Sequence, residues 1–171
     1  MGCPHRLAAG DYVGCRAYSL TICTYRRTRA FTEPAAVGLV LSQILSTAVD
    51  ERCEIVVYCF MPDHLHLIVI AHAQDADLQR FVRVAKQRSG FAFSRMAGRH
   101  LWQESYFDRT IRRLEELPAL VEYMIRNALR AGLVEDPVNY PYWGSQRYSR
   151  AELLEFVASA RRVQGPGRPG G

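Results

Sequence analysis

The sequence has almost no lysine, no paired cysteine motif and no long hydrophobic run. Lys86 is the only lysine in 171 residues, so arginine supplies nearly all the positive charge. The cysteines show no CxxC spacing, which gives no support to a disulfide framework or a zinc ribbon. Three of them fall within apolar runs, and we expect these to be small core residues: Cys23, Cys53 and Cys59.

Membrane and secretory segments are not apparent either. The longest apolar stretch, AAVGLVLSQILSTAV at 35–49, contains four polar residues and is too short to cross a bilayer. The N-terminal MGCPHRLAAG lacks the apolar region of a signal peptide. The expectation is a cytoplasmic protein, associated with the bacterial nucleoid and without a membrane partner.

What the sequence does have is a globular composition with an excess of positive charge. Hydrophobic residues make up 49% of the chain, the formal net charge is +5 and the pI is about 9.1. The length suits one domain with a real core. The charge favours a polyanionic partner such as nucleic acid, although many basic proteins bind none. Charge alone leaves both alternatives open.

The pattern of apolar residues predicts a mixed fold. Alternation and buried-type runs predict strands at 15–25, 53–60, 64–73 and 106–112. Helical periodicity predicts helices at 32–50, at 77–96 (with a break at Ser89-Gly90) and at 115–132, closed by Gly132. The order β-α-β-β-α-β, followed by a further helix, indicates an α+β, ferredoxin-like antiparallel sheet with two helices on one face.

The same pass along the chain divides it into four parts. An N-terminal segment at 1–14 precedes the main domain at 15–150. A C-terminal helix at 151–163 and a flexible Gly- and Pro-rich tail at 164–171 follow it.

Two histidines in MPDHLHL, at 61–67, are the first candidate site residues. On a strand His64 and His66 project from the same face, roughly 6.6 Å apart. Two imidazoles at this spacing can bind one metal ion, but they can also be ordinary sheet histidines. His72 shares their face but lies roughly 20 Å further along the strand, so it cannot join them.

The last predicted helix carries a candidate nucleophile. Apolar residues gather on one side of this helix, while Tyr123, Asn127, Arg126 and Arg130 gather on the other. An exposed helical tyrosine is usually unremarkable. A phenol near cations, however, is poised to attack a phosphate, because positive charge favours the phenolate. Asn127, one turn after Tyr123, offers a carbonyl oxygen to a metal.

Further basic residues, together with Arg126 and Arg130, are weaker candidates for DNA contacts. Arg80, Arg83 and Lys86 follow the polar side of the 77–96 helix, which is either a solvated face or a track for a nucleic-acid backbone. Additional arginines lie on and after the last strand: Arg109, Arg112 and Arg113.

Together these blocks resemble a known family. MPDHLHL is similar to the signature of the HUH single-tyrosine transposases. LWQESYFDRTIR at 101–112 and YMIRNALRAGLVEDPVNYPYWGS at 123–145 resemble their REP-associated branch, the RAYTs. The resemblance extends from about Arg16 to about Tyr148, and the three blocks occur in the family's order.

The resemblance implies a function for four of these residues. His64 and His66 match the metal ligands, with Asn127 completing the site for Mg²⁺ or Mn²⁺. Tyr123 matches the nucleophile that forms a 5′-phosphotyrosine and leaves a free 3′-OH. The implied substrate is single-stranded DNA next to an imperfect hairpin, and relatives act as monomers or as homodimers.

The sequence also departs from the family's pattern. Asn127-Ala128-Leu129 stands where NPV is common, and Trp143-Gly144-Ser145 differs from the usual WSS. Asp63 stands where Asn is also frequent, and it caps the turn or adds negative charge near the metal. Two alternatives stay open: a nucleic-acid-binding domain without catalysis, and a metal phosphoesterase that uses water.

Overall fold

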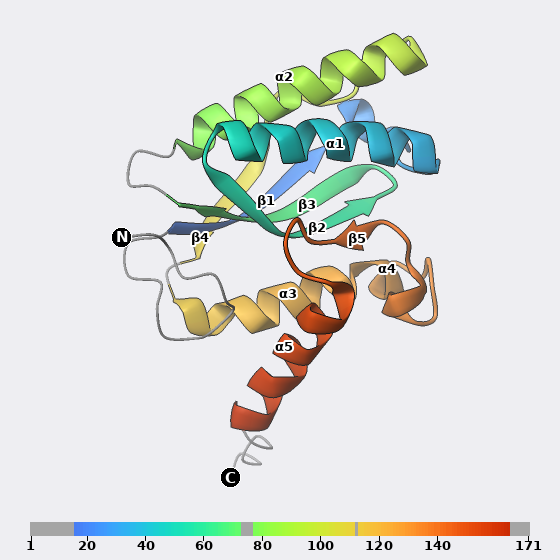
Figure 1. The fold of residues 1–171 in the computed structure, drawn as a ribbon. Coiled ribbons are helices and arrows are strands. Elements are labelled where there is room, and N and C mark those ends of the chain that lie inside the picture. The colour runs from blue at the N-terminus through green and yellow to red at the C-terminus, as the bar shows by residue number, and fades with distance from the viewer. Residues whose placement is uncertain (1–15, 73–76, 112, 165–171) are drawn as a thin grey trace.

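The protein is built on a five-stranded antiparallel sheet (Figure 1). The computed structural model describes residues 16–72, 77–111 and 113–164. The strand order is β4-β1-β3-β2-β5, with β1 at Arg16–Cys23, β2 at Cys53–Met61, β3 at His64–Ala71, β4 at Phe107–Ile111 and β5 at Trp143–Gly144. The first four strands have the ferredoxin-like order, so the predicted α+β fold is confirmed. The short β5 was not predicted.

Helices cover both faces of this sheet (Figure 1). α1 (Pro34–Asp50) and α2 (Leu78–Ala97) pack together on one face, as predicted. The other face is covered by α3 (Leu117–Ile125), α4 (Asn127–Arg130) and α5 (Arg150–Gln164). Single turns of 3-10 helix lie at Tyr25–Arg27 (η1), Leu114–Glu116 (η2) and Pro137–Asn139 (η3).

The residues of β3 divide between two cores. Leu65, Leu67 and Val69 belong to the core beneath α1 and α2, whereas Ile68 and Ile70 belong to the core beneath α3 and α5. This alternation follows from the two-residue period of a strand. It also explains why β3 is apolar almost throughout, since a strand covered on both faces needs no polar side.

The break that the sequence predicted at Ser89-Gly90 is wrong, because α2 is continuous there. The buried Ser89 hydroxyl donates to the Ala85 carbonyl and accepts from Trp102 Nε1 at 2.9 Å. A Cβ on Gly90 would lie 3.4 Å from Trp102 Cδ1. The two small residues therefore admit the Trp102 ring against the helix rather than ending it.

The helix predicted at 115–132 is interrupted at Arg126, which separates α3 from α4. Its predicted closure by Gly132 is confirmed. Gly132 has φ +70, and Gly132 N–H and Leu133 N–H donate to the carbonyls of Leu129 and Ala128. These two bonds form a Schellman motif, in which glycine avoids the strain of a left-handed residue.

Other boundaries differ slightly from the predictions. The first strand ends at Cys23, and Tyr25 begins η1 instead. Cys23, Cys53 and Cys59 are free and buried, as predicted. The segment 1–14 and nearly all of the tail lie outside the described residues, while Gln164 belongs to α5. Among the described residues, no helix is long and apolar enough to cross a membrane.

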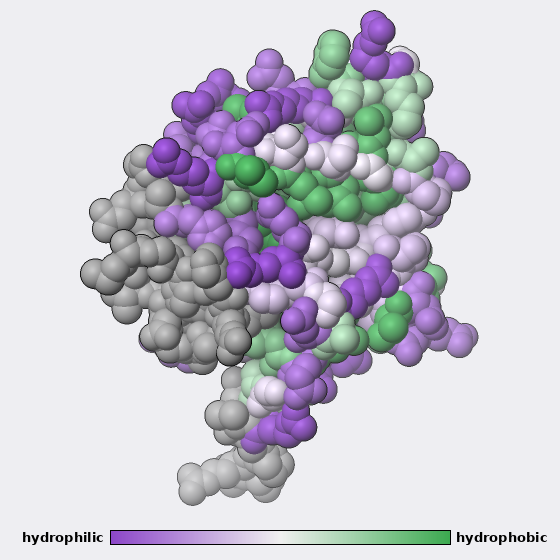
Figure 2. All heavy atoms as spheres, in the orientation of Figure 1, coloured by the Kyte–Doolittle hydropathy of each residue, from purple (hydrophilic) through white to green (hydrophobic). Residues whose placement is uncertain are grey.

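Surface character differs between elements as well. In the orientation of Figure 1, hydrophilic side chains cover much of α2, and hydrophobic ones gather in a band over α1 (Figure 2).

Gly144 in β5 is required by space, because the Tyr58 ring lies directly against it. A Cβ at this position would lie 2.6 Å from Tyr58 Oη and 2.9 Å from Tyr58 Cζ. No side chain fits here without displacing that ring, which packs against the core beneath α1 and α2.

We therefore expect Gly144→Ala to lower the free energy of unfolding by about 1–3 kcal/mol, the usual cost of overpacking. Gly38→Ala in α1 is the matched control, because a Cβ there meets nothing within 4 Å. It should instead add up to about 1 kcal/mol through helix propensity. Urea denaturation measures both, and a Gly144→Ala protein as stable as the parent would contradict the packing argument.

Candidate active site

His64 and His66 lie side by side at the start of β3 and point toward each other. Their Nε2 atoms are 3.0 Å apart, and their rings meet edge to face. Both side chains project from the sheet face that α3, α4 and α5 cover, because they share the parity of Ile68 and Ile70. The shared face predicted from the sequence is thus observed, and the two imidazoles converge on one point.

The outer nitrogen of each imidazole is held by a different neighbour. His64 Nδ1 lies 2.7 Å from Asp63 Oδ1, and His66 Nδ1 lies 3.0 Å from Thr21 Oγ1. A carboxylate only accepts hydrogen bonds, so His64 carries its proton on Nδ1 and presents a lone pair at Nε2. Partners of this kind fix the tautomer and the ring orientation of histidines that bind metals.

The charge of the pair is set by its surroundings. Burial lowers the pKa of His66 to about 4, and electrostatic interactions with His64, Arg130 and Arg27 act in the same direction. His66 is therefore neutral at physiological pH. Cys59, its cross-strand neighbour on β2, has a pKa raised by burial to about 12 and stays a thiol. His66 thus presents a neutral imidazole, and its neighbour Cys59 presents no thiolate.

Arg27 and Asp63 connect the histidine pair to η1. Arg27 was not among the site residues predicted from the sequence. Arg27 Nε lies 3.0 Å from Asp63 Oδ2, while the other carboxylate oxygen receives His64. The Thr24 hydroxyl and amide both donate to the Asp63 carbonyl. Asp63 thus orients His64, which answers the question that the sequence left open. The run YRRTR directly after the first strand was the available signal.

The helical pattern predicted that Asn127 lies on an exposed polar face, and this prediction is wrong. Asn127 is only 9% exposed, and it begins α4, which packs against β2. The interruption at Arg126 turns this residue inward. Asn127 Nδ2 is the one buried side-chain nitrogen or oxygen in the described ranges without a hydrogen-bond partner. Such an orphaned amide is costly and therefore points to a role beyond packing.

Tyr123 is exposed on α3, as predicted, and Arg130 lies over its ring. The Arg130 guanidinium carbon is 3.8 Å from the ring centroid. The same arginine is close enough to His66 to lower its pKa. Among the described residues, no hydrogen bond joins Tyr123 or Asn127 to either histidine. Arg130 is thus the group whose contacts relate the tyrosine to the histidine pair.

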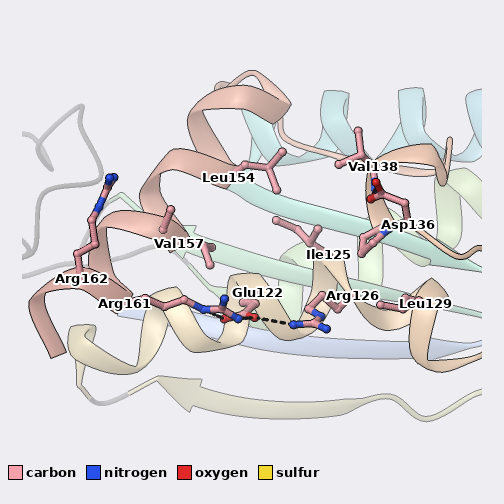
Figure 3. A pocket seen from close by; sticks show the side chains of 12 residues that line it. Glu122, Ile125, Arg126, Leu129, Asp136, Val138, Leu154, Val157, Arg161 and Arg162 are labelled. Atoms are coloured by element: carbon pink, nitrogen blue, oxygen red, sulfur yellow. Dashed lines mark hydrogen bonds and ion pairs between the residues drawn. The ribbon is translucent and has the colours of Figure 1, made fainter. Parts of the chain in front are cut away.

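The helix that carries Tyr123 is fixed from its outer side by α5. Glu122 forms ion pairs with Arg126, at the C-terminal end of α3, and with Arg161 of α5 (Figure 3). These residues line a hollow of about 460 Å³ between the two helices, whose apolar walls include Ile125 and Leu154. This is a structural contact for α3 rather than part of the histidine site.

The predicted basic stripe lies away from the histidine pair. α2 packs on the opposite sheet face, so Arg80, Arg83 and Lys86 are separated from the pair by the sheet. Arg80 pairs with Glu51, and Lys86 donates to the carbonyls of Gln103 and Glu104.

The other candidate arginines, on and after β4, differ in their surroundings. Arg109 pairs with Glu116 at 2.8 Å, and Arg113 is exposed. Arg112 lies outside the described residues. Arg126 is held by Glu122, so Arg130 is the predicted DNA-contact residue that the structure places near His66.

Comparisons with known proteins point to one family. The family model described as IS200-like transposase matches residues 13–127, more than half of the chain, and this range includes all four candidate residues. A protein of Haemophilus influenzae assigned as a REP-associated tyrosine transposase is 23% identical over 156 residues, covering 84% of this chain and 87% of the relative.

Two solved structures share the fold. A REP-associated tyrosine transposase bound to a REP hairpin superimposes with a TM-score of 0.64 at 22% identity, covering 75% of each chain. A crystal structure of a protein from Deinococcus radiodurans R1 assigned as a transposase has a TM-score of 0.51 at 24% identity. That match covers 65% of this chain and 88% of the other.

The orphaned amide of Asn127 generates a stability prediction. We expect Asn127→Leu, which keeps the branching of the side chain, to raise the free energy of unfolding by roughly 1–3 kcal/mol, because it removes a buried unpaired group. Ser89→Ala is the matched control at a buried polar residue that has partners. It should cost a similar amount, since Trp102 Nε1 loses its acceptor. Urea denaturation without added metal measures both, and a destabilised Asn127→Leu protein would sink the argument.

Proposed function

Since the chain belongs to the family of IS200-like transposases, we propose that it cleaves and rejoins single-stranded DNA through a phosphotyrosine at Tyr123. The observation that carries the proposal is the convergence of His64 and His66 Nε2, each ring oriented by its own partner. Tyr123 and Arg130 supply the second half of the site.

The donor set fits a divalent cation. The Nε2 atoms of His64 and His66 are 3.0 Å apart, so their lone pairs would repel each other unless a proton or a cation lay between them. Two ligands at roughly 2.1 Å and at right angles, as octahedral Mg²⁺ requires, are themselves about 3.0 Å apart. His64 and His66 would hold the ion, and the side-chain carbonyl oxygen of Asn127 would offer a third ligand from α4. When bound, the ion would polarise the scissile phosphate and neutralise its developing charge.

The described residues contain no cluster of three or more histidine, cysteine, aspartate or glutamate side chains that could hold a metal. A site with two imidazoles and one amide is consistent with that result. It also leaves open positions for phosphate oxygens, as a catalytic rather than a structural site needs. Mg²⁺ and Mn²⁺ suit such nitrogen and oxygen donors better than a thiolate-preferring metal does.

The chain's own groups then account for the transfer. Tyr123 Oη loses its proton and attacks the phosphorus, the bond from phosphorus to O3′ breaks, and the departing oxygen becomes a free 3′-OH. The 5′-phosphate stays on the tyrosine until a 3′-OH attacks it in the reverse reaction. Arg130, stacked on the Tyr123 ring, holds the orientation of the phenol.

We further propose that the substrate strand lies next to a hairpin and that the chain is of the REP-associated type. Support comes from the Haemophilus influenzae relative and from the similar fold of a REP-associated transposase bound to a REP hairpin. The +5 net charge suits such a substrate.

A covalent-adduct assay tests the nucleophile. We expect the protein, incubated with a single-stranded hairpin oligonucleotide and Mn²⁺, to form an adduct that survives denaturing electrophoresis. Tyr123→Phe should abolish the adduct, because the attacking oxygen is gone. Tyr25→Phe is the matched control, since the two tyrosines are 41% and 47% exposed.

Each alternative gives a different result in this assay. An adduct that persists in Tyr123→Phe would show that another residue is the nucleophile. Cleavage without any adduct would indicate a phosphoesterase that uses water. Binding without cleavage in any metal would indicate a DNA-binding domain without catalysis.

Metal binding gives an independent test. We expect His66→Ala to abolish tight Mn²⁺ binding, measured by electron paramagnetic resonance, and Thr21→Val to weaken it by about 10–100-fold, because the hydroxyl orients the His66 ring. His72→Ala is the control, because His72 interacts with Glu54 instead. Equal Mn²⁺ affinity in the His66 and His72 variants would rule out the proposed ligands.

A further inference from the structure

We propose that Phe107 stacks on a nucleobase next to the scissile phosphate and so positions the DNA strand over the histidine pair. The inference rests on the proposed function, since it assumes that single-stranded DNA is the substrate of this site. It assigns a positioning role to a residue outside the set of metal ligands and the nucleophile.

Strand register places Phe107 in one cross-strand row with His66. Phe107 of β4 pairs with Thr21 of β1, and Thr21 pairs in turn with His66 of β3. Directly opposed residues project from the same face of a sheet, and the Thr21 hydroxyl indeed contacts His66. Adjacent strands lie about 4.8 Å apart, so the Phe107 and His66 backbones are separated by roughly 10 Å.

The direction of the Phe107 side chain follows from its neighbours on β4. Ile111 shares its parity and is buried in the core beneath α3. Tyr106, of opposite parity, packs against the core beneath α1 and α2 and lies near Lys86 of α2. Phe107 therefore projects from the face that carries the histidines.

Nothing in the described part of the chain covers this ring. Phe107 is 66% exposed, although Ile111 on the same face is only 5% exposed, and no aromatic or cation contact with a described residue involves it. The helices α3, α4 and α5 thus leave the histidine end of the face open at β4. An exposed phenyl ring on a backbone roughly 10 Å from that of His66 is suited to stack on an unpaired base.

The charges around the ring favour DNA over a second protein chain. Arg27 and Arg130 act on His66, while Arg109, on the face of Phe107, is paired with Glu116. A positive groove combined with an aromatic ring is the usual arrangement for single-stranded nucleic acid. Pairing of β4 with another sheet would use its backbone edge, and it would not require a phenyl ring on the face.

Binding measured without metal tests the proposal apart from catalysis. Fluorescence anisotropy in EDTA should show that Phe107→Ala weakens binding of the single-stranded hairpin oligonucleotide about tenfold, as loss of one stacked base does. Phe107→Trp, which keeps an aromatic face, should retain the affinity. Phe91→Ala is the matched control, because Phe91 is 68% exposed but belongs to α2, on the opposite sheet face.

Abasic substrates identify the stacked base. Oligonucleotides that lack one base at successive positions on either side of the cleavage point are bound to the parent and to Phe107→Ala. At one position, removal of the base should lower the affinity of the parent but not that of Phe107→Ala, because the variant already lacks the ring on which this base stacks. A penalty that is the same for every substrate, or a loss in Phe91→Ala with none in Phe107→Ala, would overturn the proposal.

The two proposals fail in distinguishable ways. If the parent protein forms no adduct with Mn²⁺, the proposed chemistry fails, whereas the coupling between Phe107 and one base can still be observed. If adducts form but no abasic position couples to Phe107, the chemistry stands and the stacking role is wrong. Thermal unfolding should be nearly unchanged in Phe107→Ala, because the side chain is mostly exposed.

Discussion

The candidate site depends on the pairing of β1 with β3. That ladder sets Thr21 opposite His66 and Cys23 opposite His64, and it continues into the turn where the Thr24 side chain and amide bind the Asp63 carbonyl. Because a slip of one residue would send both imidazoles to the other face, the register determines whether the pair lies on the face that carries Tyr123 and Arg130. The 3.0 Å separation of the Nε2 atoms is therefore a consequence of sheet pairing and not of a local motif alone.

The two faces of the sheet also differ in how completely they are covered. The face beneath α1 and α2 is filled by core side chains. On the outside of α2, Arg80 pairs with Glu51 and Arg88 pairs with Asp50. The face beneath α3, α4 and α5 is filled only in part, and its open end holds the histidines and Phe107. The apolar run of β3 serves both cores and becomes polar only at His64 and His66. A strand that must be buried on two sides admits imidazoles only where one side is open.

Local patterns were enough to predict the ferredoxin-like order, the shared face of the histidines and the exposure of Tyr123, because each depends on the period of one element. They failed for Asn127, because a break at Arg126 changes the direction of the residues that follow it. They could not place Arg80 and Arg83, since a polar stripe does not reveal which sheet face its helix covers. Thr21 and Phe107 could not be identified because cross-strand register joins residues far apart in the chain. The ion pair of Arg27 with Asp63 likewise joins distant parts of the chain.

The two halves of the candidate site have different structural support. The histidine pair lies on the central strand β3, which is hydrogen-bonded to β1 on one side and to β2 on the other. Tyr123 lies on the short α3, which is held by its apolar face and by the ion pairs of Glu122 with Arg126 and Arg161, both exposed. Exposed ion pairs contribute little individually, so the position of α3 depends mainly on packing. A displacement of α3 would therefore move the tyrosine relative to the histidines and leave the histidine pair itself unchanged. The stacked Arg130, whose charge also reaches His66, is the contact that opposes such a displacement.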